Sequence, residues 1–126
     1  MRRALTTTFA ISTLFLVFAL SKTAFAAEGD IGPVVIERIS IIAVATGGHL
    51  AGNMEVKIEN GFTPPAGMTC DHNFITTRKI TDPDRAMLSL LLQAQTSRRF
   101  VFLRITDNAT LTAFAGRCSV EIVTLQ

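Results

Sequence analysis

Two cysteines are the side chains of this sequence with the widest chemical potential, because a cysteine can form a disulfide, bind a metal or act as a nucleophile. Cys70 and Cys118 enclose a segment of 49 residues, counted with both cysteines. In an oxidising compartment two cysteines allow a single pairing. We therefore expect a disulfide between Cys70 and Cys118.

Two alternatives use the same cysteines. A zinc ion could take the thiol and imidazole side chains of Cys70, His72, Cys118 and His49. This spacing lacks the two close ligand pairs that common zinc sites have. Cys70 could instead be a nucleophile that His72 activates, although residues two apart on a strand share a face without necessarily meeting.

The polar residues after the first cysteine are the main candidates for a binding site. Asp71, His72 and Asn73 place hydrogen-bond donors and acceptors in one loop. Arg78 belongs to a polar run that could form the ligand-facing side of a strand. A solvated loop and an edge strand protected by charge are the alternatives. We predict that Asp71, His72, Asn73 and Arg78 bind the ligand.

The sequence contains none of the common catalytic motifs. It has no paired-carboxylate motif, no G-x-S-x-G and no zinc signature. His49 lies in Gly47–Asn53, which lacks the spacing of a phosphate-binding loop and is typical of a turn. We expect a protein that is not an enzyme and needs no cofactor. The alternative is a small hydrolase or metal protein that uses His49, His72 and a free Cys70.

The first 26 residues have the pattern of a secretory signal peptide. Two arginines precede the uncharged segment 4–20, and Ala24–Ala26 supplies an A-x-A cleavage pattern. Cleavage would leave one domain, residues 27–126, in the periplasm or outside the cell. An uncleaved anchor is the alternative, although the uncharged segment is short for a membrane span.

Removal of the signal peptide changes the charge of the protein. The whole chain has a formal charge of +2, whereas residues 27–126 keep nine Lys or Arg and ten Asp or Glu, which gives −1. A nearly neutral chain has no general attraction for nucleic acid or an anionic membrane. We therefore expect no nucleic-acid partner. We also expect no membrane span after cleavage, because no second apolar stretch is long enough.

The hydrophobic pattern of residues 27–126 predicts one helix and five strands. Asp82 and Pro83 are typical of a helix start, and the helix is expected to end near Ser97. Its apolar side chains have the spacing of a deeply packed helix: Met87, Leu90, Leu91 and Ala94, widened by Leu88 and Leu92. The predicted strands are 33–46, 54–59, 74–80, 100–106 and 110–126, the last interrupted at Gly116.

The order of these elements is strand, strand, strand, helix, strand, strand. It predicts a mostly β fold, a five-stranded OB-fold-like barrel, which also removes exposed sheet edges. In that topology the third and fifth strands are parallel neighbours. The Cys70–Cys118 disulfide would then join the starts of these two strands. An α+β sheet with the helix packed on one face is the alternative fold.

With these features the chain resembles the subtilase-cytotoxin B-subunit-like family of small exported bacterial proteins. The resemblance rests on the signal peptide, on the placement of Cys70 and Cys118, and on Met87–Gln95 followed closely by Phe100–Ile105. It covers residues 54–126. It implies an OB-fold, export and a ring of five subunits. In the toxin members that ring binds sialylated glycans and carries a catalytic A subunit.

The chain departs from this family in its aromatic residues. It has no Trp and no Tyr, on which sugar rings commonly stack, and no toxin sugar-contact residue can be matched to a position here. We expect an exported, oligomeric binding protein, with a homo-pentamer and a catalytic A subunit among the implied partners. Its ligand would be a glycan or a protein. The alternative is a monomeric periplasmic structural or interaction module without a small-molecule ligand.

Overall fold

The computed structural model describes residues 26–126, so the predicted signal peptide lies outside the described residues except for Ala26. The strands are β1 (Glu28–Val34), β2 (Ile36–Ile41), β3 (Met54–Ile58), β4 (Phe74–Thr77), β5 (Val101–Thr106) and β6 (Cys118–Leu125). The helices are the short 3-10 helix η1 (Lys79–Thr81) and α1 (Ala86–Ser97). In this part of the chain no helix has the length and hydropathy needed to cross a membrane.

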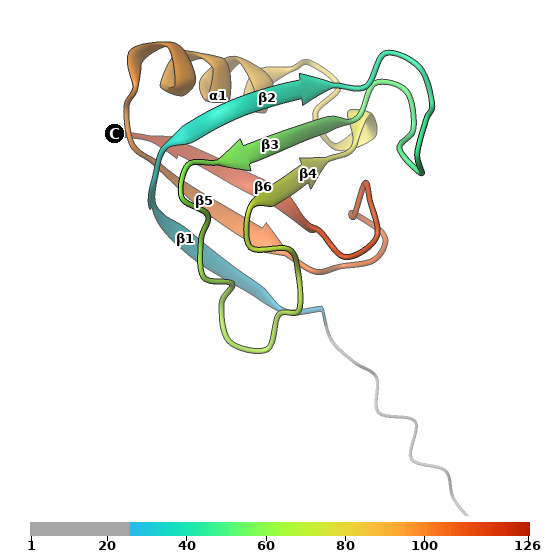
Figure 1. Ribbon diagram of the computed structural model, residues 1–126, viewed down its shortest axis with the longest axis horizontal. Coiled ribbons are helices and arrows are strands. Elements are labelled where there is room, and N and C mark those ends of the chain that lie inside the picture. Colours follow the sequence, from blue (N-terminus) through green and yellow to red (C-terminus); the bar gives the residue numbers. More distant parts are fainter. Residues whose placement is uncertain (1–25) are drawn as a thin grey trace, which may run out of the picture.

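The strands form one mixed six-stranded sheet in the order β1-β5-β6-β4-β3-β2 (Figure 1). β4 and β6 run parallel and the other neighbours run antiparallel. The predicted parallel pairing of the third strand with the last strand is therefore confirmed. The prediction of a closed five-stranded barrel is wrong, because β1 and β2 lie at the two ends of the strand order and do not pair.

The sixth strand, β1, lies mostly before the predicted strand 33–46, which includes only its last two residues, whereas β2 covers the middle of that predicted strand. Val34 is the last residue of β1 paired with β5, and Ile36 is the first residue of β2 paired with β3. Val35 between them belongs to neither ladder, and its carbonyl accepts a hydrogen bond from the Glu59 N–H at 2.9 Å. One continuous segment thus borders both ends of the curved sheet without closing it.

The helix begins later than its sequence pattern indicates. Pro83 and Asp84 form a turn, and Arg85 takes a left-handed backbone with φ of 59° before the first helical residue. Asp82 still caps the helix, because its carboxylate accepts the N–H groups of Met87 and Leu88, each at 3.1 Å. The cap is confirmed, while the placement of Pro83 in the first helical turn is wrong.

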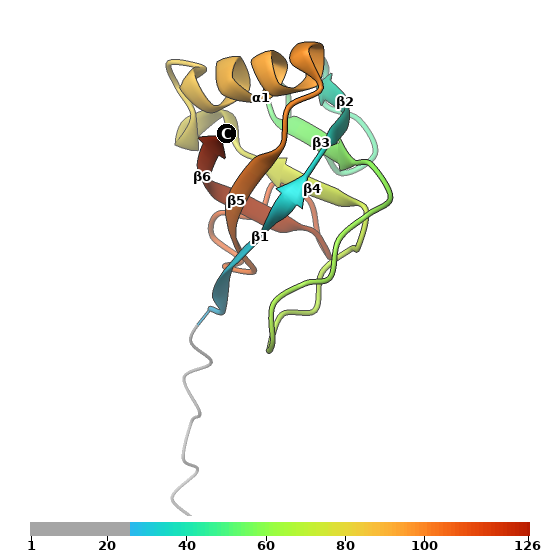
Figure 2. The ribbon, with the colours of Figure 1, turned by 90° about the vertical axis from the view of Figure 1, so that its left-hand side faces the viewer.

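The predicted deep packing of α1 is also wrong. The helix lies across one end of the sheet (Figure 2), where it packs against β2 and β6. Only Leu91 and Ala94 are buried, while Leu90 and Leu92 are 37% and 44% exposed. The core lies inside the curved sheet instead and is formed mainly by fully buried aliphatic side chains, among them Ile36, Val56, Ile75, Leu103 and Ile105.

Candidate functional site

The Cys70–Cys118 disulfide is present, with 5.4 Å between the two Cα atoms. It joins the segment before β4 to the first residue of β6, as the parallel pairing of these strands requires. Both thiols are consumed, so in this form neither cysteine is a nucleophile or a thiolate ligand for zinc. No cluster of three or more metal-binding side chains occurs within residues 26–126.

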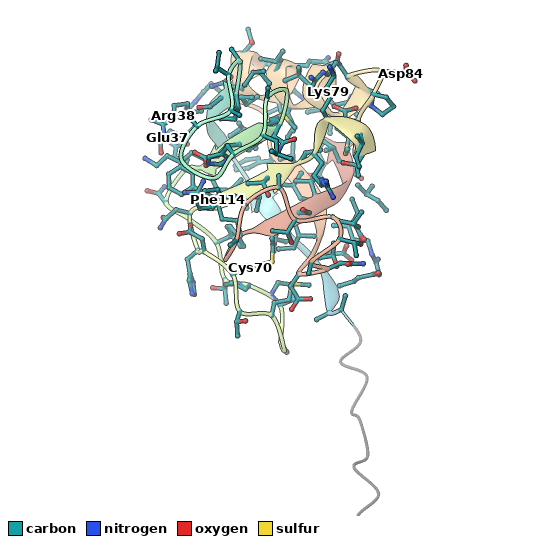
Figure 3. The ribbon with its side chains drawn as sticks, turned by 90° about the vertical axis from the view of Figure 1, so that its right-hand side faces the viewer. Glu37, Arg38, Cys70, Lys79, Asp84 and Phe114 are labelled. Atoms are coloured by element: carbon teal, nitrogen blue, oxygen red, sulfur yellow. A yellow bond between two sulfur atoms is a disulfide. The ribbon has the colours of Figure 1, made fainter. Side chains whose placement is uncertain are left out.

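Beside the disulfide, five side chains from four segments form a compact group that we call the Arg117 cluster. Its members are His49, Glu55, Phe74, Phe114 and Arg117. Glu55 lies on β3 and Phe74 on β4, while His49 comes from the β2–β3 loop and the other two from the β5–β6 loop. Both loops lie on the right-hand side of Figure 1, and Figure 3 views that side with Phe114 labelled.

The guanidinium of Arg117 is the centre of this cluster. Its carbon lies 4.5 Å from the centroid of the Phe74 ring and 4.9 Å from that of Phe114. Both distances are within the range of cation–π attraction. The guanidinium also forms an ion pair with Glu55. The side chains of Arg117 and Glu55 are only 19% and 15% exposed, so this pair is much better shielded from water than a surface pair.

His49 completes the cluster from the other loop. Its ring stacks on Phe114, with 4.2 Å between the centroids, and its Nε2 lies 3.6 Å from Oε2 of Glu55. Burial lowers the pKa of His49, and the nearby charge of Arg117 lowers it further. Burial also lowers the pKa of Arg117 itself. His49 is therefore neutral near pH 7.

This environment predicts a pH-dependent stability. The unfolded chain takes up a proton at His49 more readily than the folded chain, so His49 lowers the free energy of unfolding as pH falls through about 6.5. Thermal unfolding between pH 7.5 and 5.5 should show a larger loss of Tm for the natural chain than for His49→Gln. Equal losses in both proteins would contradict the assignment. His72→Gln is the matched control, because His72 is exposed.

A hollow of 390 Å³ opens beside the cluster, between the segment before β4 and the β5–β6 loop. We call it the loop hollow, and its lining residues are Thr69, Cys70, Asp107, Ala109, Thr112, Ala115, Gly116 and Arg117. The volume falls in the range of small-molecule sites. Its polar lining residues are two threonines, an aspartate and an arginine. Such groups suit a ligand rich in hydrogen-bonding atoms.

The predicted residues Asp71, His72 and Asn73 have mainly structural contacts. Oδ1 of Asp71 accepts the N–H groups of Asn73 and Phe74 at 2.7 and 2.8 Å, which shapes the turn into β4. The N–H of Asp71 donates to the Gly116 carbonyl at 2.8 Å. His72 and Asn73 are exposed. None of these three residues lines the loop hollow.

Arg78 lies at the opposite end of β4 from this turn. Its Nη1 donates to the carbonyl of Thr110 at 2.6 Å and so ties the β5–β6 loop to the end of β4. The structure therefore does not bring Arg78 together with Asp71, His72 and Asn73. Its contact with the loop instead makes Arg78 a support for the wall of the loop hollow.

Apart from His49 and Cys70, the sequence reasoning missed the residues that form the cluster and the hollow. Within the predicted strand 54–59 nothing singles out Glu55, and the predicted strand 110–126 begins inside what the structure shows to be a loop over residues 107–117. One signal was available: Arg117 directly precedes Cys118. A disulfide that joins two strand starts necessarily places that arginine beside the segment before β4.

No protein-family model, curated protein or solved structure matches this chain.

Proposed function

We propose that this chain is an exported, non-enzymatic binding protein with an OB-fold-like domain, and that it binds a glycan in the loop hollow. The carrying observation is the position of the Arg117 cluster and the hollow. The cluster occupies the β3–β4 face and the two loops that flank it, and the hollow lies beside it against the β5–β6 loop. In OB-folds the corresponding strands and loops bind oligosaccharides and oligonucleotides. The chain is nearly neutral and has no general attraction for an anionic oligonucleotide, so its charge favours an oligosaccharide.

The Arg117 cluster supports this proposal by fixing the loops before any ligand arrives. Phe114 packs against both His49 and Arg117, so its ring is already used by the protein. The cluster therefore acts as a rigid wall rather than as a platform on which a sugar ring stacks. A preorganised wall lowers the entropic cost of binding.

The polar lining of the loop hollow supplies the expected contacts. The hydroxyl group of Thr69 can donate and accept, Asp107 accepts, and Arg117 donates. The hydroxyl of Thr112 donates to the Asn108 carbonyl and can still accept. Sugar hydroxyl groups need this mixture of donors and acceptors. The same lining offers no nucleophile paired with a base, which favours binding over catalysis.

Filling the hollow is the direct test. Ala115 is exposed and lines the hollow, so Ala115→Phe occupies the space without removing any polar contact. We expect a glycan array to give a signal with the natural protein, and Ala115→Phe to weaken binding at least tenfold, about 1.4 kcal/mol. Ala66→Phe, at another exposed alanine outside the hollow, should bind normally. Equal binding by both variants would exclude the hollow as the site.

The second candidate is a monomeric periplasmic structural or interaction module without a small-molecule ligand. Its specific support is the exposed apolar β2–β3 loop, where Val44 is 75% and Leu50 57% exposed, together with Ile80 at 71%. Large apolar side chains that a partner covers where they gather on a surface are a feature of protein contacts. Light scattering separates the candidates: a pentamer favours a toxin-like B subunit that could carry a catalytic A subunit, and a monomer with no glycan signal favours the module.

A further inference from the structure

Ala27, the residue that follows the predicted cleavage site, is held in place by hydrogen bonds to the end of β5. The N–H of Ala27 donates to Oδ1 of Asp107 at 2.8 Å. The carbonyl of Ala27 accepts from the Thr106 hydroxyl at 3.0 Å and from the Asp107 N–H at 3.2 Å. Three hydrogen bonds thus tie this residue to the end of β5. Ala26, one residue earlier, is exposed.

We propose that cleavage after Ala26 creates an α-ammonium on Ala27 that forms an ion pair with the Asp107 carboxylate and fastens the start of β1 to the end of β5. This inference rests on the proposed export of the chain. Cleavage is a hydrolysis: the amide bond between Ala26 and Ala27 breaks, and water supplies a hydroxyl to the Ala26 carbonyl carbon. The released Ala27 nitrogen gains a proton from that water and a second from solvent, which makes it the ammonium.

The surroundings of Asp107 favour an ammonium over an amide. Within residues 26–126 no lysine, arginine or histidine forms an ion pair with this partly buried carboxylate. Arg117 lines the same hollow but is paired with Glu55. An ammonium adds to this hydrogen bond an attraction between opposite charges that the amide N–H lacks. The nitrogen already lies at hydrogen-bonding distance, so the ion pair needs no rearrangement of the backbone.

The ion pair also concerns the loop hollow. Asp107 contributes the only carboxylate among the hollow's lining residues. The Ala27 N–H already holds one oxygen of this carboxylate, and the ammonium adds compensation of its negative charge. The processed chain and the precursor therefore differ in the charge of the hollow.

The test starts from the full precursor, exported from a bacterial host. The intact mass of the purified protein should correspond to a chain that begins at Ala27. Asp107→Asn should then lower Tm by about 4–8 °C, the shift that corresponds to about 1 kcal/mol in a domain of this size. The matched control is Asp84→Asn. Asp84 is exposed at the periphery (Figure 3) and forms no ion pair within the described residues.

A second precursor isolates the ammonium from the side chain. Insertion of one alanine between Ala26 and Ala27 keeps the A-x-A pattern, and its product, checked by mass, carries an amide at Ala27. In this product Asp107→Asn should lower Tm by less than half of the fall that it causes in the product that begins at Ala27. An equal fall in Tm in both products, or a mature chain that begins at another residue, would overturn the inference. Glycan binding is scored separately, so correct processing without any ligand would refute only the proposed function.

If Asp107→Asn cannot be recovered, the pH dependence of Tm for the two processed products answers the same question. An ammonium paired with a carboxylate has a raised pKa. Its stabilisation is complete below about pH 8 and is lost as pH rises through the higher folded value. The product that begins at Ala27 should therefore lose more stability between pH 7 and 10 than the product with the inserted alanine. Parallel curves would overturn the inference.

Discussion

Replacement of both Cys70 and Cys118 by serine is expected to lower the free energy of unfolding by about 4 kcal/mol. The disulfide closes a loop with a sequence separation of 48, and the chain-entropy relation gives this value for a loop of that length. The loop contains β4, α1 and β5. Without the disulfide, this half of the domain gains conformational freedom in the unfolded chain. In a domain of this size the expected fall in Tm is about 15–30 °C.

Thermal unfolding in the presence and absence of a reductant is the measurement. The natural chain under reducing conditions should approach the Tm of the double serine variant, and the variant should not respond to the reductant. Met68→Leu is the matched control for disturbed packing. Met68 contacts Cys118, with 3.7 Å between the sulfur atoms, but takes no part in the covalent bond. A loss of less than about 1 kcal/mol in the double variant would contradict the entropic argument.

The disulfide was predictable because it depends on composition and compartment, and the sequence contains only two cysteines. The parallel pairing of β4 with β6 was predictable from element order, since that order matches a known topology. Barrel closure was not predictable. It depends on whether strands at the two ends of the order pair with each other, and β1 and β2 do not.

The helix shows a second limit of sequence reasoning. Asp82 and Pro83 correctly indicate a nearby helix start, but Arg85 ends the preceding turn in a left-handed conformation and moves the start to Ala86. The side chain of Arg85 donates to the Gly52 carbonyl at 3.0 Å, a contact with the β2–β3 loop. Tertiary contact thus accompanies the shift in the boundary, and local propensity could not reveal it.

The candidate site was the least predictable part of the molecule. Glu55 and Lys57 occupy equivalent positions in the alternation of β3, and sequence gives no reason to separate them. The structure does: Glu55 meets Arg117 beneath two loops, whereas Lys57 pairs with Glu37 near the surface. Which polar residue of a strand becomes covered depends on the loops that fold over it, and loop paths follow from long-range pairing.

This difference leads to the second large effect. Glu55→Gln is expected to lower the free energy of unfolding by about 2–4 kcal/mol, because it leaves the guanidinium of Arg117 largely buried without its counter-charge. The value is below that for a fully buried pair, since both side chains keep some exposure to water. Chemical denaturation at pH 7.5, where His49 is neutral, measures the loss directly.

Glu37→Gln is the matched control, because it removes the same charge from an ion pair whose side chains are 41% and 33% exposed. Such a pair is worth at most about 1 kcal/mol, so the control should change little. The double variant Glu55→Gln with Arg117→Met should regain part of the stability lost in Glu55→Gln, since no uncompensated charge remains. Equal losses at the two glutamates, or no recovery in the double variant, would show that the Arg117 cluster is not held by the charge of Glu55.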